Sequence, residues 1–390
     1  MQLQSVGKNI LGRLTDSAES LKAFLFNYET PRVITVHNYR VGLIYRCVQL
    51  CIVTYLLGYV FMWEKSYQEF ASVESSVTTK VKGILQGTVI GQKNRKDVWD
   101  AADFVFPAQE TNAFFIATTV IHTVNQTQSE CAEDPNVSRN GIICNGRRDC
   151  ARGDVAVNGV KTGRCVPWNS TVKTCEISAW CPLEVDEPPS APLLSSYESL
   201  TVLVKNHVAF PKFGVKRRNI LDSINQTYLE TCRFHPSNHP FCPVFSIKDI
   251  VKLAGEDFME TATRGAIIGF GIQWNCDLDF NIDYCRPVYA FRRLDDKDDQ
   301  IARGWNFRYS RRSVDHNGKD RRDLIKLWGI RFVFNVSGRA GRFSAVNFLL
   351  TIGSGIGLLG LASLVCEFLL LTCVRPPHRN DLIQQKFCKV

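Results

Sequence analysis

Apolar residues in this chain of 390 residues gather into two long segments, one close to each end. The first covers residues 43–63 and the second residues 343–374. Because about 20 apolar helical residues span the ~30 Å hydrocarbon layer of a bilayer, each segment is long enough to cross a membrane. Two crossings place both chain ends on one side and the intervening residues on the other. This topology excludes soluble enzymes and leaves receptors, channels and tethered ectoenzymes.

Between the two segments, short runs of β-branched and aromatic residues are bounded by Gly, Pro, Asn or Asp, a pattern typical of strands. We expect strands near residues 77–81, 114–120, 200–204, 267–274 and 330–336. Helical periodicity is weak except near residues 247–253. The predicted fold class is an integral membrane α+β protein. Two transmembrane helices, at 43–63 and 343–374, flank a large β-rich, disulfide-bonded extracellular domain at 64–342.

Basic residues mark the outer flank of each apolar segment. They are Arg32, Arg40 and Arg46 around the start of the first, and Arg375, Arg379, Lys386 and Lys389 after the second. An excess of Lys and Arg within about 15–20 residues of a membrane segment marks the cytoplasmic side. We therefore expect cytosolic tails at 1–42 and 375–390. The first tail lacks an apolar stretch before a cleavage site, which favours a signal anchor over a removable signal peptide.

The middle of the chain carries features of a secreted domain. Asn-x-Ser/Thr sequons begin at Asn125, Asn136, Asn169, Asn225 and Asn335, and none lies in either tail. Ten of the 15 cysteines fall between positions 131 and 285, and an even number in an oxidising compartment implies disulfides. Six of them lie in 131–181, which we expect to form a loop-rich, stapled head. The five cysteines in membrane or tail (Cys47, Cys51, Cys366, Cys373 and Cys388) should be free.

The second apolar segment has features that an inert anchor does not need. Polar Thr351 and Ser354 share one helix face, and Gly353 and Gly357 permit close helix packing, which alone would also explain the glycines. Glu367 lies near its cytoplasmic end. We therefore expect the second segment to line a pore. Because two helices cannot enclose a conduit, a channel requires an oligomer.

Cationic residues recur at strand spacing in the middle of the chain. Residues i and i+2 of a strand share a face, so Lys80 and Lys82 project together, as do Asn306 and Arg308. Thr201, Leu203 and Lys205 form a third set on one face. Like charges this close repel unless an anion lies between them, and a polyphosphate would satisfy Lys and Arg donors. The alternative for each pair is a solvated strand face.

Signatures of other functions are weak. The chain has no Gly-x4-Gly-Lys-Ser/Thr phosphate loop, no Gly-x-Ser-x-Gly and no His-Glu-x-x-His, so we do not expect an enzyme. No Cys-x2-Cys pair occurs, and His235 and His239 flank Pro236, so we predict no metal site beyond a modulatory one. The net charge of +9 is spread without a dense basic block, which does not indicate nucleic-acid binding. Arg152-Gly153-Asp154 is a candidate adhesion tripeptide.

Several motifs, in order between the two apolar segments, carry a resemblance to a known family. They are Lys80-Val81-Lys82-Gly83, Cys175-Glu176-Ile177 to Trp180-Cys181-Pro182, Asn306-Phe307-Arg308, Gly329-Ile330-Arg331-Phe332 and the stretch 338–343. With ten extracellular cysteines in the family's order, the chain resembles the P2X receptors, trimeric ATP-gated cation channels. The stretches 23–26, 104–109 and 351–357 look most like the first vertebrate subtype. The family's C-terminal Tyr-x-x-x-Lys motif, linked to surface retention, here has Leu382 in place of the tyrosine.

The resemblance implies a set of functional residues. Lys80, Lys82, Asn306, Arg308 and Lys326 would hold the triphosphate of ATP, and Thr201 and Leu203 would contact adenine. Leu350, Thr351 and Ser354 would form the gate. Cysteine order in the family implies the pairs Cys131–Cys181, Cys144–Cys165, Cys150–Cys175, Cys232–Cys242 and Cys276–Cys285.

The function expected from this resemblance is a plasma-membrane channel that opens to sodium, potassium and calcium when extracellular ATP binds between subunits. It needs no cofactor, since ATP is an agonist. Its partners would be membrane lipid and two further copies of the chain, or related subunits in a heterotrimer. A proton-gated or epithelial-type trimeric sodium channel and a two-pass ectonucleotidase are the alternatives.

Overall fold

The structure is a computed structural model that describes residues 39–88, 96–107, 110–136, 143–184, 191–192, 194–298 and 304–373. Most of both expected cytosolic tails, including Leu382, lies outside the described residues. The chain forms two compact units. One consists of Met1–Gln68 with Ser344–Val390, and the other of Glu69–Phe343.

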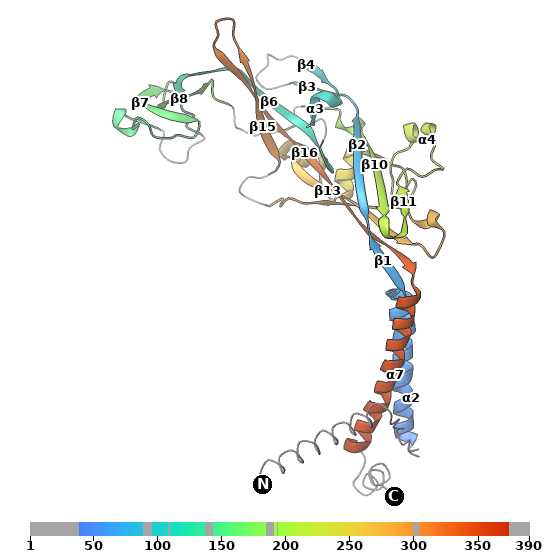
Figure 1. Cartoon of the computed structure of the whole chain (residues 1–390). Coiled ribbons are helices and arrows are strands. Elements are labelled where there is room, and N and C mark those ends of the chain that lie inside the picture. Colours follow the sequence, from blue (N-terminus) through green and yellow to red (C-terminus); the bar gives the residue numbers. More distant parts are fainter. Residues whose placement is uncertain are drawn as a thin grey trace, which may run out of the picture. The chain divides into compact units, whose positions relative to one another are not determined.

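The first unit is a pair of helices that lie side by side (Figure 1). The first helix is α2 (Tyr39–Thr54), continued by the π-helical segment η1 (Tyr55–Trp63), and the second is α7 (Ala345–Cys373). Both are long and apolar enough to cross a membrane, at Gly42–Trp63 and Ala345–Leu369. The second helix starts two residues later than its hydrophobicity predicts, because Phe343 still belongs to a strand. At the contact, a Cβ added to Gly355 would lie 3.1 Å from Leu56 Cδ1.

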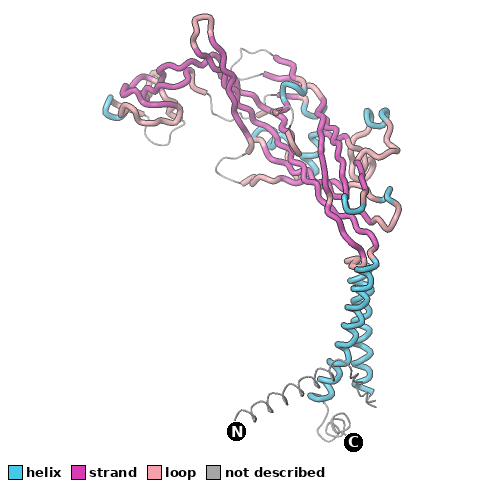
Figure 2. The backbone as a smooth tube through the Cα atoms, in the orientation of Figure 1, coloured by secondary structure: helices cyan, strands magenta, loops and turns pink. Residues whose placement is uncertain are grey.

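The second unit is built from three sheets, drawn in magenta in Figure 2. The nine-stranded sheet has the order β14-β13-β16-β6-β8-β7, with β1 and β15 also on β16 and β5 on β6. Its strands are β1 (Gln68–Ser72), β5 (Val105–Phe106), β6 (Ala113–Ala132), β7 (Gly159–Pro167), β8 (Lys173–Cys181), β13 (Ala266–Asp277), β14 (Val288–Arg293), β15 (Asn306–Val314) and β16 (Asp320–Phe343). All five expected strand regions lie in strands of this domain.

The two smaller sheets complete the domain. In the four-stranded sheet, β11 (Val215–Arg218), β10 (Thr201–Phe210) and β12 (Val244–Ser246) follow in that order, with β2 (Glu74–Lys82) also on β10. The three-stranded sheet has the order β4 (Lys96–Trp99), β3 (Leu85–Thr88), β9 (Leu194–Ser195).

Short helices connect the strands. They are α3 (Ala101–Phe104), α4 (Gln226–Thr231), α5 (Ile247–Leu253) and α6 (Phe258–Arg264), with 3-10 turns η2 (Arg147–Asp149), η3 (Tyr197–Ser199), η4 (Pro211–Phe213) and η5 (Ile282–Tyr284). Helix α5 has the bounds that its periodicity predicted. Helix α6 has the same length as α5, and the remaining helices are shorter; the sequence pattern predicted none of these others.

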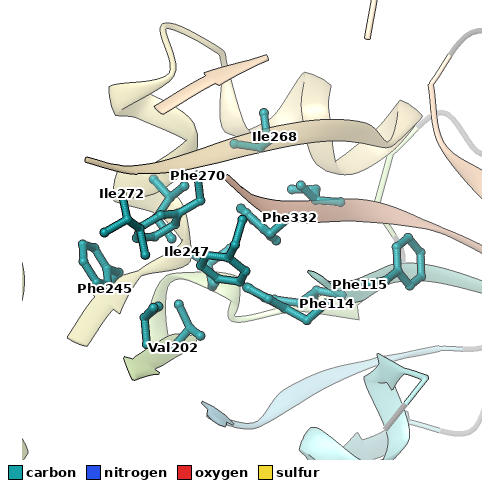
Figure 3. Packing of buried hydrophobic residues seen from close by; sticks show 14 of the residues in the cluster. Phe114, Phe115, Val202, Phe245, Ile247, Ile268, Phe270, Ile272 and Phe332 are labelled. Carbon is teal, nitrogen blue, oxygen red and sulfur yellow. The ribbon is translucent and has the colours of Figure 1, made fainter. Parts of the chain in front are cut away.

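The core of the second unit lies between the large sheet and the four-stranded sheet (Figure 3). Phe332 of β16 stacks on Phe114 of β6 with ring centroids 4.8 Å apart. Phe270 of β13 meets Phe245 of β12 edge to face, also at 4.8 Å. Aromatic pairs of this kind stabilise a core beyond their buried area, by about 0.5–1.5 kcal/mol each. These contacts fix which face of each strand points inward.

The head is stapled as a separate subdomain. Three disulfides, Cys131–Cys181, Cys144–Cys165 and Cys150–Cys175, join the strands β6, β7 and β8 and the loops between them. Cys232–Cys242 and Cys276–Cys285 close short loops elsewhere, so all five pairs implied by the resemblance are present. The head is less loop-rich than expected, because β7 and β8 form an antiparallel ribbon that pairs with the end of β6.

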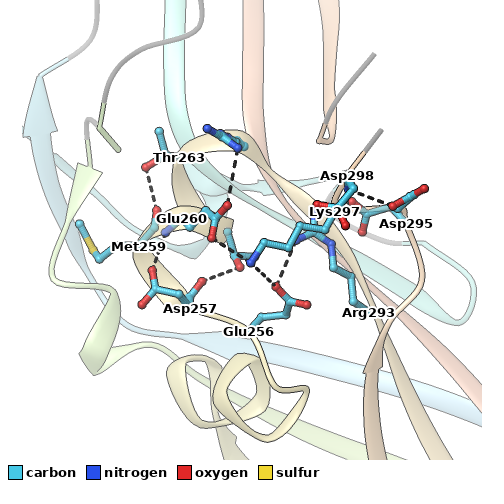
Figure 4. A network of polar contacts seen from close by, with 12 residues as sticks. Glu256, Asp257, Met259, Glu260, Thr263, Arg293, Asp295, Lys297 and Asp298 are labelled. Atoms are coloured by element: carbon cyan, nitrogen blue, oxygen red, sulfur yellow. Dashed lines mark hydrogen bonds and ion pairs between the residues drawn. The ribbon is translucent and has the colours of Figure 1, made fainter. Parts of the chain in front are cut away.

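Asp295, which follows β14, belongs to a network of ion pairs and hydrogen bonds. Asp295 is 16% exposed, accepts a hydrogen bond from Ile267 N at 2.7 Å and pairs with Arg293 at 2.8 Å. Arg293 also pairs with Glu256, and Lys297 pairs with Glu260 at 3.0 Å (Figure 4). These contacts tie the end of β14 to α6 and to the start of β13.

A buried amide network joins the two larger sheets. Asn206 on β10 is fully buried; its Oδ1 accepts from Trp274 Nε1 at 2.8 Å, and its Nδ2 donates to Ser76 O at 3.0 Å. Asn219 accepts from Asn206 N and donates to Tyr289 OH at 3.2 Å. Burial raises the pKa of Tyr289 to about 12, so its hydroxyl stays neutral at physiological pH. The network spans β2, β10, β13 and β14.

Replacing Asn206 by alanine should therefore destabilise the extracellular domain by about 3 kcal/mol, since it leaves the buried Trp274 N–H without an acceptor. The measurement is the apparent melting temperature of the full-length protein in detergent. Ser76→Ala is the matched control, because that exposed side chain lies beside the network and only its backbone carbonyl takes part. Equal melting temperatures for the two variants would contradict the assigned role of the network.

Candidate functional site

The first set of predicted binding residues lies across the antiparallel pair β2 and β10. Lys80 is directly opposite Leu203, and Lys82 is directly opposite Thr201. Both lysines are exposed, whereas Thr201 and Leu203 are half-buried beside them. Side chains directly opposite in such a pair have Cβ atoms about 5 Å apart. The two ammonium groups and the two candidate adenine contacts therefore share one small patch.

The residues between these four are buried, so the patch must lie on the outer face of the strand pair. Val202 and Val204 are fully buried and Val81 packs against the same core. A shift of register by one residue would put the lysines into that core, so the pairing is strongly specified. Gly83 ends the motif with φ +138, and a Cβ there would lie 2.5 Å from Leu200 Cδ2, so no larger residue fits.

The second set lies across β15 and β16. Arg308 is directly opposite Lys326, and Asn306 is directly opposite Trp328. Asn306 and Arg308 are exposed, while Phe307 between them meets Phe115 edge to face, with centroids 5.0 Å apart. The alternation predicted from Asn306 and Arg308 is thus present. Lys326 joins them through cross-strand pairing, which spacing along the sequence cannot reveal.

Lys326 is unusual because its side chain carries charge in a buried place. It is 7% exposed, and its ammonium lies 5.1 Å from the ring centroid of Trp328. Burial lowers the pKa of Lys326, since desolvation disfavours the charged form. An anion bound beside it would favour the charged form and so raise that pKa again. Lys326 is therefore the member of the set whose charge gains most from a bound phosphate.

Glu184 completes the second set, and no sequence motif pointed to it. Its side chain is 9% exposed and forms an ion pair with Arg308, while its Oε2 is buried and has no hydrogen-bond partner among the residues that the structure describes. The cationic face also extends beyond the predicted residues. Arg312 is directly opposite Arg322, and both guanidinium groups lie over the ring of Trp180. Burial, then repulsion from Arg312 and Arg308, lowers the pKa of Arg322.

The two sets belong to different sheets of one chain. β2 and β10 lie in the four-stranded sheet, whereas β15 and β16 lie in the nine-stranded sheet. Each set is assembled by its own cross-strand register. The structure of one chain thus presents two partial sites, each with two cations or more on an exposed face.

The remaining predicted residues lie as follows. All five sequon asparagines are exposed (Asn125, Asn136, Asn169, Asn225 and Asn335). In α7, Leu350 is 67% exposed, Thr351 Oγ1 donates to Asn347 O at 2.7 Å, and Ser354 Oγ donates to Thr351 O at 2.8 Å. The Ser354 hydroxyl therefore bonds to its own helix, whereas the Thr351 hydroxyl also lies 3.4 Å from Ser66 O, outside α7.

The weaker candidates fall on exposed loops. His235 and His239 are paired through their backbones, and the Nδ1 atoms of both rings lie within hydrogen-bond distance of a neighbour. In the tripeptide at 152–154, Asp154 pairs with Lys161 at 3.6 Å. Nothing in these contacts assigns either segment a ligand.

The comparison with protein families decides the identity of the scaffold. The family model for the ATP P2X receptor matches residues 26–389. The chain belongs to this family.

Two relatives and a crystal structure support this family assignment. P2X purinoceptor 4 from Bos taurus is 44% identical, with 93% of each chain covered. P2X purinoceptor 5 from Mus musculus is also 44% identical, over 90% of this chain and 77% of its own. A crystal structure of a P2X receptor from the Gulf Coast tick, solved with ATP and Zn²⁺, is 42% identical with a TM-score of 0.77, covering 84% of this chain and all of its own. Resemblance to the first vertebrate subtype stays a prediction.

Glu184→Gln should shift the ATP concentration–response curve to lower concentrations. The carboxylate holds Arg308 before ligand arrives, so a neutral isostere releases that guanidinium for phosphate. An ion pair with one exposed partner is worth about 0.5–1 kcal/mol, which corresponds to a shift of roughly two- to fivefold. Whole-cell recordings at a range of ATP concentrations measure it. Glu130→Gln, which removes a partner of Arg164 in the head, is the control and should leave the curve in place.

Proposed function

We propose that this chain is a trimeric, ATP-gated cation channel of the plasma membrane, in which the two partial sites of neighbouring chains together bind one ATP. The observation that carries this proposal is the cross-strand placement of these cations, with Lys80 and Lys82 on one exposed face and exposed Arg308 directly opposite the buried Lys326. The family is one of receptors, which does not support the ectonucleotidase or the proton-gated or epithelial-type channel.

Different residues suit different parts of ATP. Lys80, Lys82, Arg308 and Lys326 provide positive charge for the triphosphate, and the amide of Asn306 adds a hydrogen-bond donor. Thr201 and Leu203 lie directly opposite the two lysines, where a half-buried hydroxyl and an apolar side chain suit the edge and face of adenine. The chain needs no cofactor for this task, since ATP acts as agonist.

Sharing the site between two chains explains why one chain separates its cations onto two sheets. Each half alone holds like charges whose repulsion is relieved by an anion. ATP carries about four negative charges, so it attracts both halves at once and favours a closed cleft between them. A hundredfold preference for the closed form is worth roughly 2.7 kcal/mol, and three sites give roughly 8 kcal/mol with which to shift gating.

Strand β16 provides a path from the site to the membrane. It carries Lys326, is hydrogen-bonded to β13 and β6, and ends at Phe343, two residues before α7 begins. A strand held on both sides moves as a rigid element. Movement of Lys326 toward phosphate is therefore passed along β16 to the start of α7, and the α7 helices separate.

The pore would be lined by α7 from each of three chains. Gly353 and Gly357 have no neighbouring atom within 4 Å of an added Cβ, whereas Gly355 faces Leu56. The surface that α2 leaves uncovered therefore has small residues available for packing against other copies. Leu350, Thr351 and Ser354 lie on this helix at the level proposed for the gate. Sodium, potassium and calcium would pass between them.

The orientation follows from the same arrangement. An extracellular ATP site requires residues 64–342 outside the cell and both termini in the cytoplasm, which agrees with the basic flanks of the membrane segments. Exposure of all five sequons is compatible with glycans at each. Related subunits could take the place of one copy and give heterotrimers.

Lys80→Ala should abolish the inward current evoked by ATP or shift its concentration–response curve by about 30- to 150-fold, since a lost charge-assisted contact to phosphate costs roughly 2–3 kcal/mol. The measurement is whole-cell current during a fast ATP pulse at negative potential. Lys319→Ala, an exposed lysine in the β15–β16 turn, is the matched control. Surface labelling must show equal amounts of all proteins, and an unchanged curve for Lys80→Ala would refute the site.

A cysteine at position 350 should become reactive toward a charged, membrane-impermeant thiol reagent when ATP opens the channel. Modification would then block the current, because Leu350 would lie on the water-filled path. The native protein, which has Cys47, Cys51 and Cys366 in its membrane helices, serves as control and should keep its current. Block that proceeds equally without ATP would place position 350 outside the gate.

A further inference from the structure

A cavity of about 580 Å³ lies apart from the proposed ATP residues, where β10 and β11 meet the loop closed by Cys276–Cys285. Strands β10 and β11 are labelled side by side in Figure 1. The charged or titratable side chains around the cavity are His207, Lys216, Arg217, Arg218, Asp283 and Arg286, with Asp222 at its rim. Its volume is that of an ordinary small-molecule site.

Positive charge in this cavity exceeds the negative charge available to balance it. Four basic side chains face two carboxylates. Arg218 forms an ion pair with Asp222, which lowers the pKa of that carboxyl group. Within the described part of the chain, no carboxylate lies within ion-pair distance of Lys216 or Arg286. The cavity therefore keeps an excess of cationic groups.

Arg217 is the least satisfied of these groups. Its side chain is 16% exposed, and its distance to Asp283 is 3.7 Å, too long for a hydrogen bond. Its Nε is buried without a hydrogen-bond partner among the described residues. A buried guanidinium N–H without an acceptor is costly, whereas a phosphate oxygen would satisfy it. Arg286 is held close by, since its Nε donates to Asp283 O at 2.7 Å.

We propose that this cavity binds a compact phosphate-bearing anion at a site distinct from the ATP site. Arg217 and Arg286 provide the main contacts, and Lys216 and Arg218 supply further positive charge. His207 lies on the same face of β10 as Leu203 but four residues further along, which is about 13 Å in a strand. A single small anion therefore cannot contact both sites.

The position of the cavity gives its occupant a route to the membrane segment. Two hydrogen bonds join the Cys276–Cys285 loop to the end of β16. Leu278 N donates to Gly341 O at 2.8 Å, and Phe343 N donates to Asp279 Oδ1 at 2.6 Å. An anion that joins β11 to this loop would restrain the residues that precede α7. The site is thus placed to modulate gating without taking part in ATP recognition.

The test is calorimetric titration of pyrophosphate into the purified full-length channel. Titration is done on a Lys80→Ala background, so that binding to the proposed ATP site does not contribute. Pyrophosphate should still bind to this protein, and adding Arg217→Gln with Arg286→Gln should weaken binding at least about tenfold. Lys252→Gln, an exposed lysine of α5 that does not line the cavity, is the matched control and should not change the affinity.

Asp283→Asn provides an independent variant in which binding should improve several-fold, because it removes a carboxylate that faces Arg217. A gain of affinity cannot come from misfolding. Absence of pyrophosphate binding to the Lys80→Ala protein, or equal affinity with and without the two arginine substitutions, would overturn the proposal. Neither result bears on ATP-evoked current in the native protein, so failure of this site is distinguishable from failure of the ATP site.

Discussion

In the proposed mechanism, gating by ATP depends on repulsion between cations that two strand pairs hold close together, Lys80 with Lys82 and Arg308 with Lys326. The strands leave these groups little freedom to move apart, because the alternate residues Val81, Val202 and Phe307 are anchored in the core. Charges on flexible loops would separate and relax. On a pleated surface the repulsion persists, partly offset at Arg308 by Glu184, until an anion binds, and in the proposed mechanism its relief favours the open channel.

Strand pairing around the site determines where a movement of Lys326 is transmitted in this mechanism. β16 pairs with β15 over residues 320–328, with β6 over 321–333 and with β13 over 330–341, so bending it would break hydrogen bonds of at least one ladder, and its register with β6 shifts between Trp328 and Gly329. The buried amides of Asn206 and Asn219 hold the four-stranded sheet to the same body. In the proposed mechanism, a displacement at Lys326 is carried along this strand toward its end at Phe343.

The sequence predicts much of this because period-two alternation is a local signal. Lys80, Lys82, Asn306 and Arg308 could be assigned to exposed faces from spacing alone, and helix α5 from its period. Lys326 could not, since it joins Arg308 through cross-strand register between distant segments. Glu184 and the cavity at Arg217 were missed for the same reason. The chemistry of each depends on a residue far away in the sequence. The spacing of residues along the chain does not reveal such a neighbour.

The membrane helices of a single chain leave much of α7 exposed, which is compatible with packing against other copies in the proposed channel. Helix α7 contacts Leu56 of η1 at Gly355, whereas a Cβ added at Gly353 or Gly357 would have no described atom within 4 Å, and Leu350 is 67% exposed. In a bilayer the hydrophobic effect does not drive helices together, so their association depends on close packing of small residues. Contacts of that kind between copies can be exchanged without disturbing a hydrophobic core. The open and closed pores can therefore differ in packing between chains, while the fold of each chain stays intact.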